Sequence, residues 1–454
     1  SKSAPTSPAG LPPAGEAFCF FPRRKTVRIL VIGSGGREHA LVWKIRQSPL
    51  CTDLIVTPGN GGTQLDGVRS ADVKPDDILG LLKLAREEKV DLVVPGPELP
   101  LVLGITDAMN VAGIPCFGPD RYCAQLEGSK YFAKDLMKKA GVPTAECAVF
   151  NDAESAHSFV AHRGAPLVIK ADGLAAGKGV VVARTTEEAL QAVDAIMKDH
   201  VFGDAGRQVV IEECLEGEEV SLLCLCDGLS AVPLPSAQDH KAAYDGDKGP
   251  NTGGMGAYSP APILPDSELE KMTDLVIRPV IKHLAGENHP FVGVLYAGLM
   301  MTKDGPKVLE YNVRFGDPEC QPLLMRLDGD LVKIMLACTR GNLDPSLVTF
   351  TPKSALGVVV AAEGYPGSYD RGMPITGLKE AESEDGVKVF HSGTKFRDGQ
   401  VLSDGGRVLC VTALGDGLKD AQDRAYRAVN RITMPKSFHR TDIGMKGIRH
   451  LEGK

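Results

Sequence analysis

Three short apolar runs near the start of the chain, each followed by a glycine-rich loop, most constrain the fold. After the first run, Val27–Ile32, come Gly33–Gly36 and a helix pattern from Glu38 to Gln47. Alternation of buried strands with helices is typical of parallel strands joined by helical crossovers. Ligands of open parallel sheets bind outside the carboxyl ends of the strands. We therefore expect an open parallel α/β sheet whose binding crevice is built from three loops: Gly33–Gly36, Thr57–Thr63 and Pro95–Glu98.

The first of these loops matches only part of a dinucleotide-binding fingerprint. The fingerprint requires a third glycine where this chain has Glu38. A nicotinamide or flavin site is therefore a weaker interpretation of this loop than a phosphate site. Free N–H groups at a helix start nevertheless attract phosphate. Plain tight turns explain any one loop but fit all three less well.

A second segment opens with LEGSK, which ends at Lys130, and predicts a helix after it. Further on, the strands Leu167–Lys170 and Val180–Ala183 flank the loop DGLAAGKG. This loop is not a P-loop, because its glycines are one residue too close and no Ser or Thr follows Lys178. A glycine loop between antiparallel strands predicts a lid that covers phosphates, with Lys130, Lys170 and Lys178 nearby. Read singly, each lysine is more often a solvated surface group.

The stretch KVLEYNVRFGDPECQ, which starts at Lys307, gathers side chains suited to metal and phosphate chemistry. Its composition predicts a strand, in which side chains repeat every two residues. Glu310, Asn312 and Arg314 would therefore share one face. A carboxylate and an amide oxygen suit Mg²⁺, and a guanidinium binds carboxylate or phosphate. A solvated edge strand is the alternative, but the following turn adds two more carboxylates.

The acidic turn EECLEGEEVS follows an apolar strand at 209–211. This pattern is explained if the backbone pairs with adenine and a carboxylate binds the ribose hydroxyls; a solvated acidic turn is the alternative. After Arg340, strands such as Leu356–Ala362 and Arg407–Thr412 precede an amphipathic helix over Leu418–Ile432. They predict a small α+β domain that supports the site.

Composition and charge exclude several classes of protein. The net charge of -7 gives no footprint for nucleic acid or an anionic membrane, and no apolar run approaches the ~20 residues of a membrane span. Eleven cysteines without a CxxC pair indicate a reducing compartment. Residues 1–26 contain a single acidic residue, Glu16, and indicate a disordered leader or a transit-peptide remnant. We expect a cytoplasmic monomer, or a plastid or mitochondrial one if the leader is such a remnant.

Taken together, the motifs resemble those of a known family. Lys130, Lys170, DGLAAGKGV, EECLEGEEVS and LEYNVRFGDPE are similar, in this order, to the ATP-grasp fold. GSGGREHAL, VTPGNGGT, PGPE, QDHK, GPNTGGMGAYSP and RFGDPECQ are similar to the phosphoribosylamine–glycine ligase (glycinamide ribonucleotide synthetase) family, over about residues 27–448. One departure is Ala242, since the family usually carries Arg after QDHK, and the role of that cation is in doubt here.

The resemblance implies an N-terminal α/β substrate domain at 27–127, an ATP-grasp domain at 128–330 and a C-terminal α+β domain at 345–448. A lid subdomain would span about 144–214. The implied reaction joins glycine to 5-phosphoribosylamine through glycyl phosphate, with ATP as co-substrate and Mg²⁺ or Mn²⁺ as the metal. It would give glycinamide ribonucleotide, ADP and phosphate in de novo purine biosynthesis.

The resemblance also assigns roles by motif position. Glu310 and Asn312 would hold the metal. The ATP site would comprise Lys130, Lys170, Gly173, Gly177, Lys178, Gly179, Glu212, Glu213, Leu215 and Glu219. Phosphoribosylamine would meet Gly33, Gly35, Gly36, Asn60, Gly62, Thr63, Glu98 and Arg314, and the catalytic groups would be Arg314, Asp317, Lys170, Asp239 and Lys241.

Two other classes share part of this pattern. A different ATP-grasp carboxylate–amine ligase would keep the ATP residues but not the N-terminal loops, and product analysis separates the two. A nucleotide-binding module without turnover would not need the intact row of Glu310, Asn312 and Arg314.

Overall fold

The computed structural model describes residues 26–174, 179–199 and 206–453. Its N-terminal unit contains the predicted open parallel sheet, in the order β3-β2-β1-β4. Cys116 extends the sheet through a parallel bridge to Val93. The strands are β1 Val27–Gly33, β2 Cys51–Pro58, β3 Arg69–Ser70 and β4 Leu92–Pro95; the helices are α1 Gly36–Ile45, α2 Gly61–Leu65, α3 Ile78–Glu87, α4 Glu98–Val102 and α5 Ile105–Val111.

The three glycine-rich loops meet at the carboxyl edge of this sheet, as predicted. The amide of Gly59 donates to the carbonyl of Gly33 at 3.1 Å. The amide of Gly96 donates to the carbonyl of Ile32 at 2.9 Å, and the side chain of Asn60 donates to the carbonyl of Ser34 at 2.9 Å. The loops therefore form one surface.

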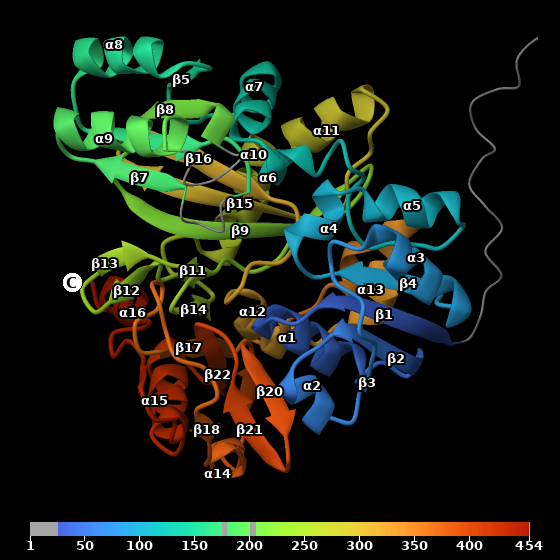
Figure 1. The fold of residues 1–454 in the computed structure, drawn as a ribbon. Helices are drawn as coiled ribbons and strands as arrows, with labels where there is room; N and C mark the ends of the chain where they lie inside the picture. Colours follow the sequence, from blue (N-terminus) through green and yellow to red (C-terminus); the bar gives the residue numbers. More distant parts are fainter. Residues whose placement is uncertain (1–25, 175–178, 200–205, 454) are drawn as a thin grey trace, which may run out of the picture.

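The middle of the chain forms two antiparallel sheets (Figure 1). The lid sheet runs β5-β8-β6-β7 and is covered by two helices, while the central sheet runs β10-β9-β15-β16. The lid elements are β5 Cys147–Phe150, α8 Ala153–Arg163, β6 Leu167–Ala171, β7 Val180–Ala183, α9 Thr186–Met197 and β8 Val209–Glu213. The central strands are β9 Glu218–Asp227, β10 Ala231–Pro233, β15 Val292–Thr302 and β16 Gly305–Asn312. The neighbouring helices are α6 Gln125–Gly128, α7 Lys130–Ala140, α10 Leu269–Val276, α11 Arg278–Gly286 and α13 Leu331–Thr339, while α12 Cys320–Arg326 packs against α1 and the C-terminal sheet.

The C-terminal sheet includes strands from the middle of the chain. Its order is β11-β14-β17-β22-β19, so β11 Gln238–Asp239 and β14 Gly256–Ser259 extend a sheet made otherwise by residues after 353. This exchange places the QDHK segment and the C-terminal strands in one sheet. The remaining elements are β12 Ala242–Tyr244, β13 Lys248–Asn251, β17 Ser354–Ala362, β18 Pro374–Ile375, α14 Leu378–Glu382, β19 Val387–His391, β20 Thr394–Arg397, β21 Gln400–Ser403, β22 Arg407–Gly415, α15 Leu418–Val429, β23 Ser437–Phe438 and α16 Met445–Leu451.

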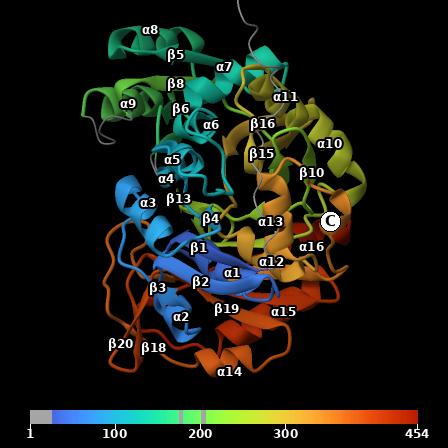
Figure 2. The same ribbon diagram turned by 90° about the vertical axis from the view of Figure 1, so that its right-hand side faces the viewer.

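The N-terminal and C-terminal units lie against each other, and the lid sheet lies at the opposite end of the molecule (Figures 1 and 2). One hydrophobic cluster joins α3 and α5 to the central sheet and to β17, β22 and α15. The lid has a separate cluster around Ile169 and Ile211. Within the described residues, no helix has the length and apolarity needed to cross a membrane.

Candidate active site

The strand β16 and the two residues that follow it carry the predicted row of polar side chains. Tyr311 and Val313 are 2% and 1% exposed and belong to the main hydrophobic cluster. Glu310, Asn312 and Arg314 are only partly buried and point to the other face, which confirms the predicted alternation. Arg314 donates from Nη2 to Oδ1 of Asn312 at 3.1 Å. The row is therefore connected internally.

A bulge brings a lysine of the lid sheet onto this strand. The register of β15 and β16 shifts after Gly298, so that Glu310 and Val308 are paired and Leu309 is not. The unpaired Leu309 carbonyl accepts a hydrogen bond from Nζ of Lys170 at 3.3 Å. Bulges redirect strands in this way beside active sites.

Lysines surround the carboxylate of Glu310. Nζ of Lys241 lies 3.8 Å from Oε1 of Glu310 and 2.9 Å from Oε2 of Glu219. Burial raises the pKa of Glu310, but four cations outweigh burial and hold the pKa below its usual value. In decreasing order of effect they are Lys241, Lys170, Lys130 and Arg314. An anionic carboxylate within a cationic field is suited to a site shared by a metal ion and phosphates.

Lys130 begins α7 and reaches the lid loop. Ser129 caps this helix by accepting from the amide of Phe132 at 3.0 Å. Nζ of Lys130 donates to the carbonyl of Gly173 at 2.6 Å, and burial lowers its pKa. Gly173 has a φ of +128°, which favours glycine. The strands flanking the loop are antiparallel, as predicted.

The lid loop is described only at its two ends. Of its predicted ATP-binding residues, Gly173 and Gly179 are described, whereas Gly177 and Lys178 lie outside the described residues.

Glu212 is held by two lysines. Its Oε1 lies 2.9 Å from Nζ of Lys170, and its Oε2 lies 3.0 Å from Nζ of Lys134. All three side chains are buried, with Glu212 2% exposed. Lys134 also donates to Oγ1 of Thr144 at 2.7 Å. The side chain of Glu212 is thus engaged, and its backbone lies within the lid sheet, opposite Cys147 of β5 and Val168 of β6.

Glu213 and Leu215 lie where the lid sheet joins the central sheet. Oε1 of Glu213 accepts from Nζ of Lys307 at 2.8 Å and from the amide of Glu146 at 3.1 Å. Leu215 is half-buried between β8 and β9. The connection between β8 and β9 therefore lies beside the lysine cluster formed by Lys130, Lys170 and Lys241. This connection is the predicted position of the adenine.

Arg314 connects the row to the N-terminal unit. Its Nε donates to Oε2 of Glu98 at 3.2 Å, and its Nη2 donates to Oε1 of Glu127. Oε2 of Glu127 also accepts from the amide of Val313 at 2.8 Å. Burial raises the pKa of Glu127 to about 7, whereas Arg314 helps to lower that of Glu98 against burial. The predicted substrate residues Glu98 and Arg314 are in direct contact.

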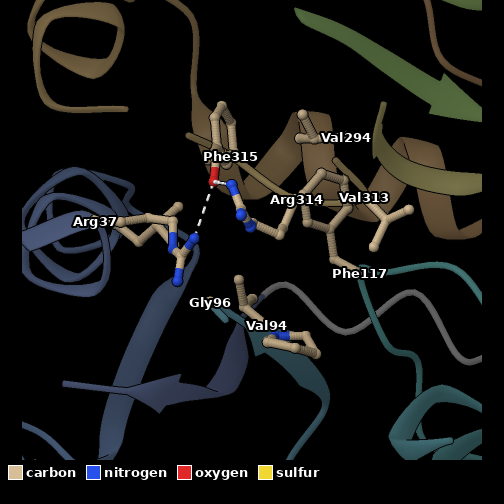
Figure 3. Close-up of a pocket in the computed structure, with 10 residues that line it drawn as sticks. Arg37, Val94, Gly96, Phe117, Val294, Val313, Arg314 and Phe315 are labelled. Atoms are coloured by element: carbon tan, nitrogen blue, oxygen red, sulfur yellow. Dashed lines mark hydrogen bonds between the residues drawn. The ribbon is translucent and has the colours of Figure 1, made fainter. Parts of the chain in front are cut away.

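A small cavity of about 10 Å³ lies between these loops and the end of the row (Figure 3). Two guanidinium groups converge on one of its carbonyls: Arg37 and Arg314 donate from Nη1 to the oxygen of Phe315 at 3.0 and 3.2 Å. Val94 and Gly96 line the opposite wall, at the carboxyl end of β4. One side of the cavity thus consists of two guanidinium groups that are paired with carboxylates, and the other side is apolar.

Glu38 fills the first glycine loop. Its carboxylate accepts from the amide of Gly35 and from Nε of Arg37, the latter at 2.6 Å. A Cβ on Gly33 or Gly96 would lie 2.5 or 2.0 Å from the Glu38 side chain. The residue at the position of the missing third glycine therefore occupies the space between the loops, and one N–H group expected to bind phosphate already has a carboxylate partner.

The second glycine loop binds the C-terminal unit. Oδ1 of Asn60 accepts from the amides of Gly62 and Thr63 at 2.9 and 3.1 Å. Its Nδ2 donates to the carbonyl of His391 at 2.7 Å. A Cβ on Gly62 would lie 2.4 Å from the ring of His39. These predicted substrate residues therefore also fix the junction of the two units.

Two predicted catalytic carboxylates lie on the side of the row that faces the C-terminal sheet. Asp317 accepts from Nε2 of Gln321 at 2.9 Å, and Nη2 of Arg407 lies 3.6 Å from its Oδ2. Burial and the charge of Glu319 raise the pKa of Asp239. Lys241, next but one to Asp239, instead points to Glu310.

Several residues of this region were not predicted from the sequence. Glu127 and Lys134 flank Lys130 at spacings of three and four, so their proximity to that predicted cation was a usable signal. Arg37 directly follows the first glycine loop. Arg407 carried no signal, because 90 residues separate it from Asp317.

The lid sheet, the central sheet and the lysines and carboxylates between them define an ATP-grasp protein. Solved biotin carboxylases share this fold: the domain from Hydrogenobacter thermophilus 2-oxoglutarate carboxylase aligns with a TM-score of 0.73 at 16% identity, over 95% of this chain and 96% of that one. A phosphoribosylamine–glycine ligase from Thermotoga maritima aligns with a TM-score of 0.80 at 32% identity, over 92% of this chain and all of that one.

Sequence comparison gives the family. Profiles of the phosphoribosylglycinamide synthetase N domain, ATP-grasp (A) domain and C domain match residues 27–127, 128–320 and 355–446. Proteins named phosphoribosylamine–glycine ligase from Allochromatium vinosum and Vibrio parahaemolyticus are 52% and 48% identical, over 93% and 94% of this chain and 99% and 100% of their own lengths. The chain belongs to the phosphoribosylglycinamide synthetase family.

Proposed function

We propose that this protein joins glycine to 5-phosphoribosylamine with ATP, in the formation of glycinamide ribonucleotide for purine biosynthesis. The contact of Arg314 with both Asn312 and Glu98 supports this function most directly. It joins the ATP-facing strand to the loops of the N-terminal unit, so a phosphorylated carboxylate and an attacking amine can meet across one side chain.

The triphosphate would lie against the lysine cluster. Lys130 and Lys170 bind its oxygens, and the loop bounded by Gly173 and Gly179, with Gly177 and Lys178, covers it. The backbone of Glu212, Glu213 and Leu215 contacts adenine, and Glu219 contacts the ribose. Lys241 links this ribose position to the row, since it lies near both Glu219 and Glu310.

Glu310 and Asn312 fit a divalent cation, Mg²⁺ or Mn²⁺. Both present hard oxygen donors two residues apart on one strand face, and the carboxylate is anionic because the surrounding lysines hold its pKa low. When bound, such an ion neutralises phosphate charge. Arg314 orients the Asn312 amide by donating to its oxygen.

Glycine would be activated beside Arg314. An oxygen of its carboxylate attacks the γ-phosphorus of ATP, and the bond from that phosphorus to the ADP oxygen breaks. This step gives glycyl phosphate and ADP. The amine of phosphoribosylamine then attacks the carbonyl carbon, phosphate leaves, and the nitrogen loses a proton. Phosphate is a better leaving group than the carboxylate oxygen of free glycine. The protein therefore needs mainly to position the reactants and to neutralise their charge. Arg314, Lys170 and Lys241 neutralise the acyl phosphate, and Asp239 and Asp317 orient the ammonium group.

Phosphoribosylamine would bind at the carboxyl edge of the parallel sheet. Gly33, Gly35 and Gly36, with Asn60, Gly62 and Thr63, form this surface, and Glu98 lies at its inner end. The chain would thus divide into a substrate domain at 27–127, an ATP-grasp domain at 128–330 and a supporting domain at 345–448.

Isotope transfer tests the reaction. Glycine carrying ¹⁸O in both carboxylate oxygens should deliver one label to inorganic phosphate and keep one in the amide product. Omitting phosphoribosylamine provides the control, since no labelled phosphate should then accumulate at the catalytic rate. Inorganic phosphate free of ¹⁸O, with the second label recovered in water, would refute the glycyl phosphate intermediate.

A further inference from the structure

One guanidinium of the C-terminal sheet ends inside the candidate active site. Arg407 begins β22, and its Nη1 donates to the carbonyl of Gly253 at 2.7 Å, to that of Gly254 at 3.4 Å and to that of Asp317. Its Nη2 lies 3.6 Å from the Asp317 carboxylate. The Arg407 side chain therefore contacts the glycine loop at 252–254, the backbone of the turn after β16, and the Asp317 carboxylate in that turn.

The glycine loop is shaped around this arginine. A Cβ on Gly253 would lie 3.0 Å from Cζ of Arg407, and the amide of Gly253 donates to the hydroxyl of Tyr365 at 3.2 Å. Gly254 has a φ of +112°, and a Cβ there would lie 2.6 Å from Oδ1 of Asp239. Both residues that hold Gly253 thus come from the C-terminal unit, and the space beside Gly254 is occupied by the predicted catalytic carboxylate of Asp239.

The charge of Arg407 acts on the same carboxylates. Burial raises the pKa of Asp317, but Arg407 and, more weakly, Arg37 of α1 outweigh burial and hold that pKa below its usual value. Gln321 of α12 adds a hydrogen bond. Arg407 also opposes the rise that burial and Glu319 produce in the pKa of Asp239, as does Lys241. Among the described residues, the cation that lowers the pKa of Asp317 most is therefore Arg407, which belongs to a different domain from Asp317.

We propose that Arg407 is a positioning residue of the ligase reaction, through which the C-terminal sheet orients the Asp317 carboxylate and the 252–254 loop toward substrate. This inference rests on the proposed function, because it assigns Asp317 and Asp239 to the binding of glycine or its acyl phosphate. The C-terminal unit would then complete the active site and not merely cover it.

The test compares Arg407→Met, Arg407→Lys and the surface control Arg397→Met in the full chain. Arg397 lies in the same C-terminal unit and its side chain is 74% exposed. For each protein, kcat and KM for glycine and for ATP are measured from pH 5 to 9, with the melting temperature. We expect Arg407→Met to lower kcat/KM for glycine by roughly a hundredfold, the scale of a small misplacement of reacting groups. The KM for ATP should change less than twofold.

The pH profile separates positioning from support of the fold. In the parent the pKa of Asp317 lies below 3.8, so this group gives no acid limb of kcat/KM between pH 5 and 9. Without its cation Asp317 should protonate at higher pH, so an acid limb should enter this range in Arg407→Met. Arg407→Lys keeps the charge but lacks the planar fork, so its acid side should match that of the parent and part of the activity should return.

Three results would overturn the inference: full activity in Arg407→Met, an acid limb unchanged in that variant, or a loss explained wholly by ATP binding and melting temperature. If Arg407→Met does not fold, Arg407→Lys decides, since parental kcat/KM for glycine would then refute the need for the fork. A parent that forms no amide from glycine and phosphoribosylamine would refute the proposed function instead.

Discussion

Replacing Glu212 by Gln should lower the stability of the lid sheet strongly, although Gln has nearly the same size and shape as Glu. The carboxylate is buried between Lys134 and Lys170, with contacts of 3.0 and 2.9 Å. At an effective dielectric of about 20, each contact corresponds to roughly 5 kcal/mol of Coulomb attraction before desolvation is subtracted. Breaking a buried pair from one side costs about 3–5 kcal/mol, because the remaining charge stays buried without its partner. We expect a loss in this range.

Hydrogen exchange of the β6 and β8 amides measures this loss where it occurs. A loss of 3–5 kcal/mol corresponds to exchange that is faster by roughly a hundredfold to a few thousandfold. The single tryptophan, Trp43, lies in α1, so its fluorescence in urea reports the N-terminal unit and should not change. Glu213→Gln is the matched control. That residue pairs with Lys307 at 2.8 Å, but both side chains are more than a quarter exposed, and such pairs contribute at most about 1 kcal/mol.

The loss should also depend on pH. Burial lowers the pKa of Lys134, and Glu212 opposes this effect. In the variant the folded-state pKa falls further, so the unfolded state binds more protons than the folded state over a wider range below the ordinary value of 10.5. Stability then rises with pH in this range, and the difference between variant and parent should shrink as the pH rises toward 10.5. Exchange equal to that of Glu213→Gln at every pH would refute the role of the buried triad.

Glu310→Gln should lower turnover by roughly a hundredfold or more and raise the Mg²⁺ concentration needed for half-maximal rate, because it removes a unit charge from the metal position; an unchanged Mg²⁺ dependence would exclude Glu310 as a ligand. Lys241→Met removes a cation 3.8 Å from Glu310, so we expect Mg²⁺ to bind up to about fivefold more tightly, as measured by titration without nucleotide, given the partial exposure of this pair. Burial lowers the pKa of His391 to about 3. Below pH 6.5 the unfolded chain therefore takes up a proton that the folded chain does not, and going from pH 7 to 5 should cost the parent about 2 kcal/mol more than His391→Gln in urea unfolding; equal slopes would refute this.

Local sequence rules determined the parts of this protein that depend on neighbours along the chain. Side chains in a strand alternate whatever packs on them, so the shared face of Glu310, Asn312 and Arg314 followed from the spacing alone. Glycine at the strand ends and the period of the helices likewise predicted the open sheet and its loops. The lid hairpin followed from two β-rich runs that flank the glycines.

Only the tertiary structure revealed the strand pairings and side-chain contacts between segments that are distant in the chain. The pairing of β14 with β17 places Gly256 opposite Val358, and short strands carry no local mark of such a partner. Arg407 reaches Asp317 only because of this shared sheet, and Glu38 is recognisable as loop filling only once Gly33 and Gly96 are seen around it. The free energy of these contacts comes from burial and charge pairing between distant residues, and no periodicity in the sequence encodes that pairing.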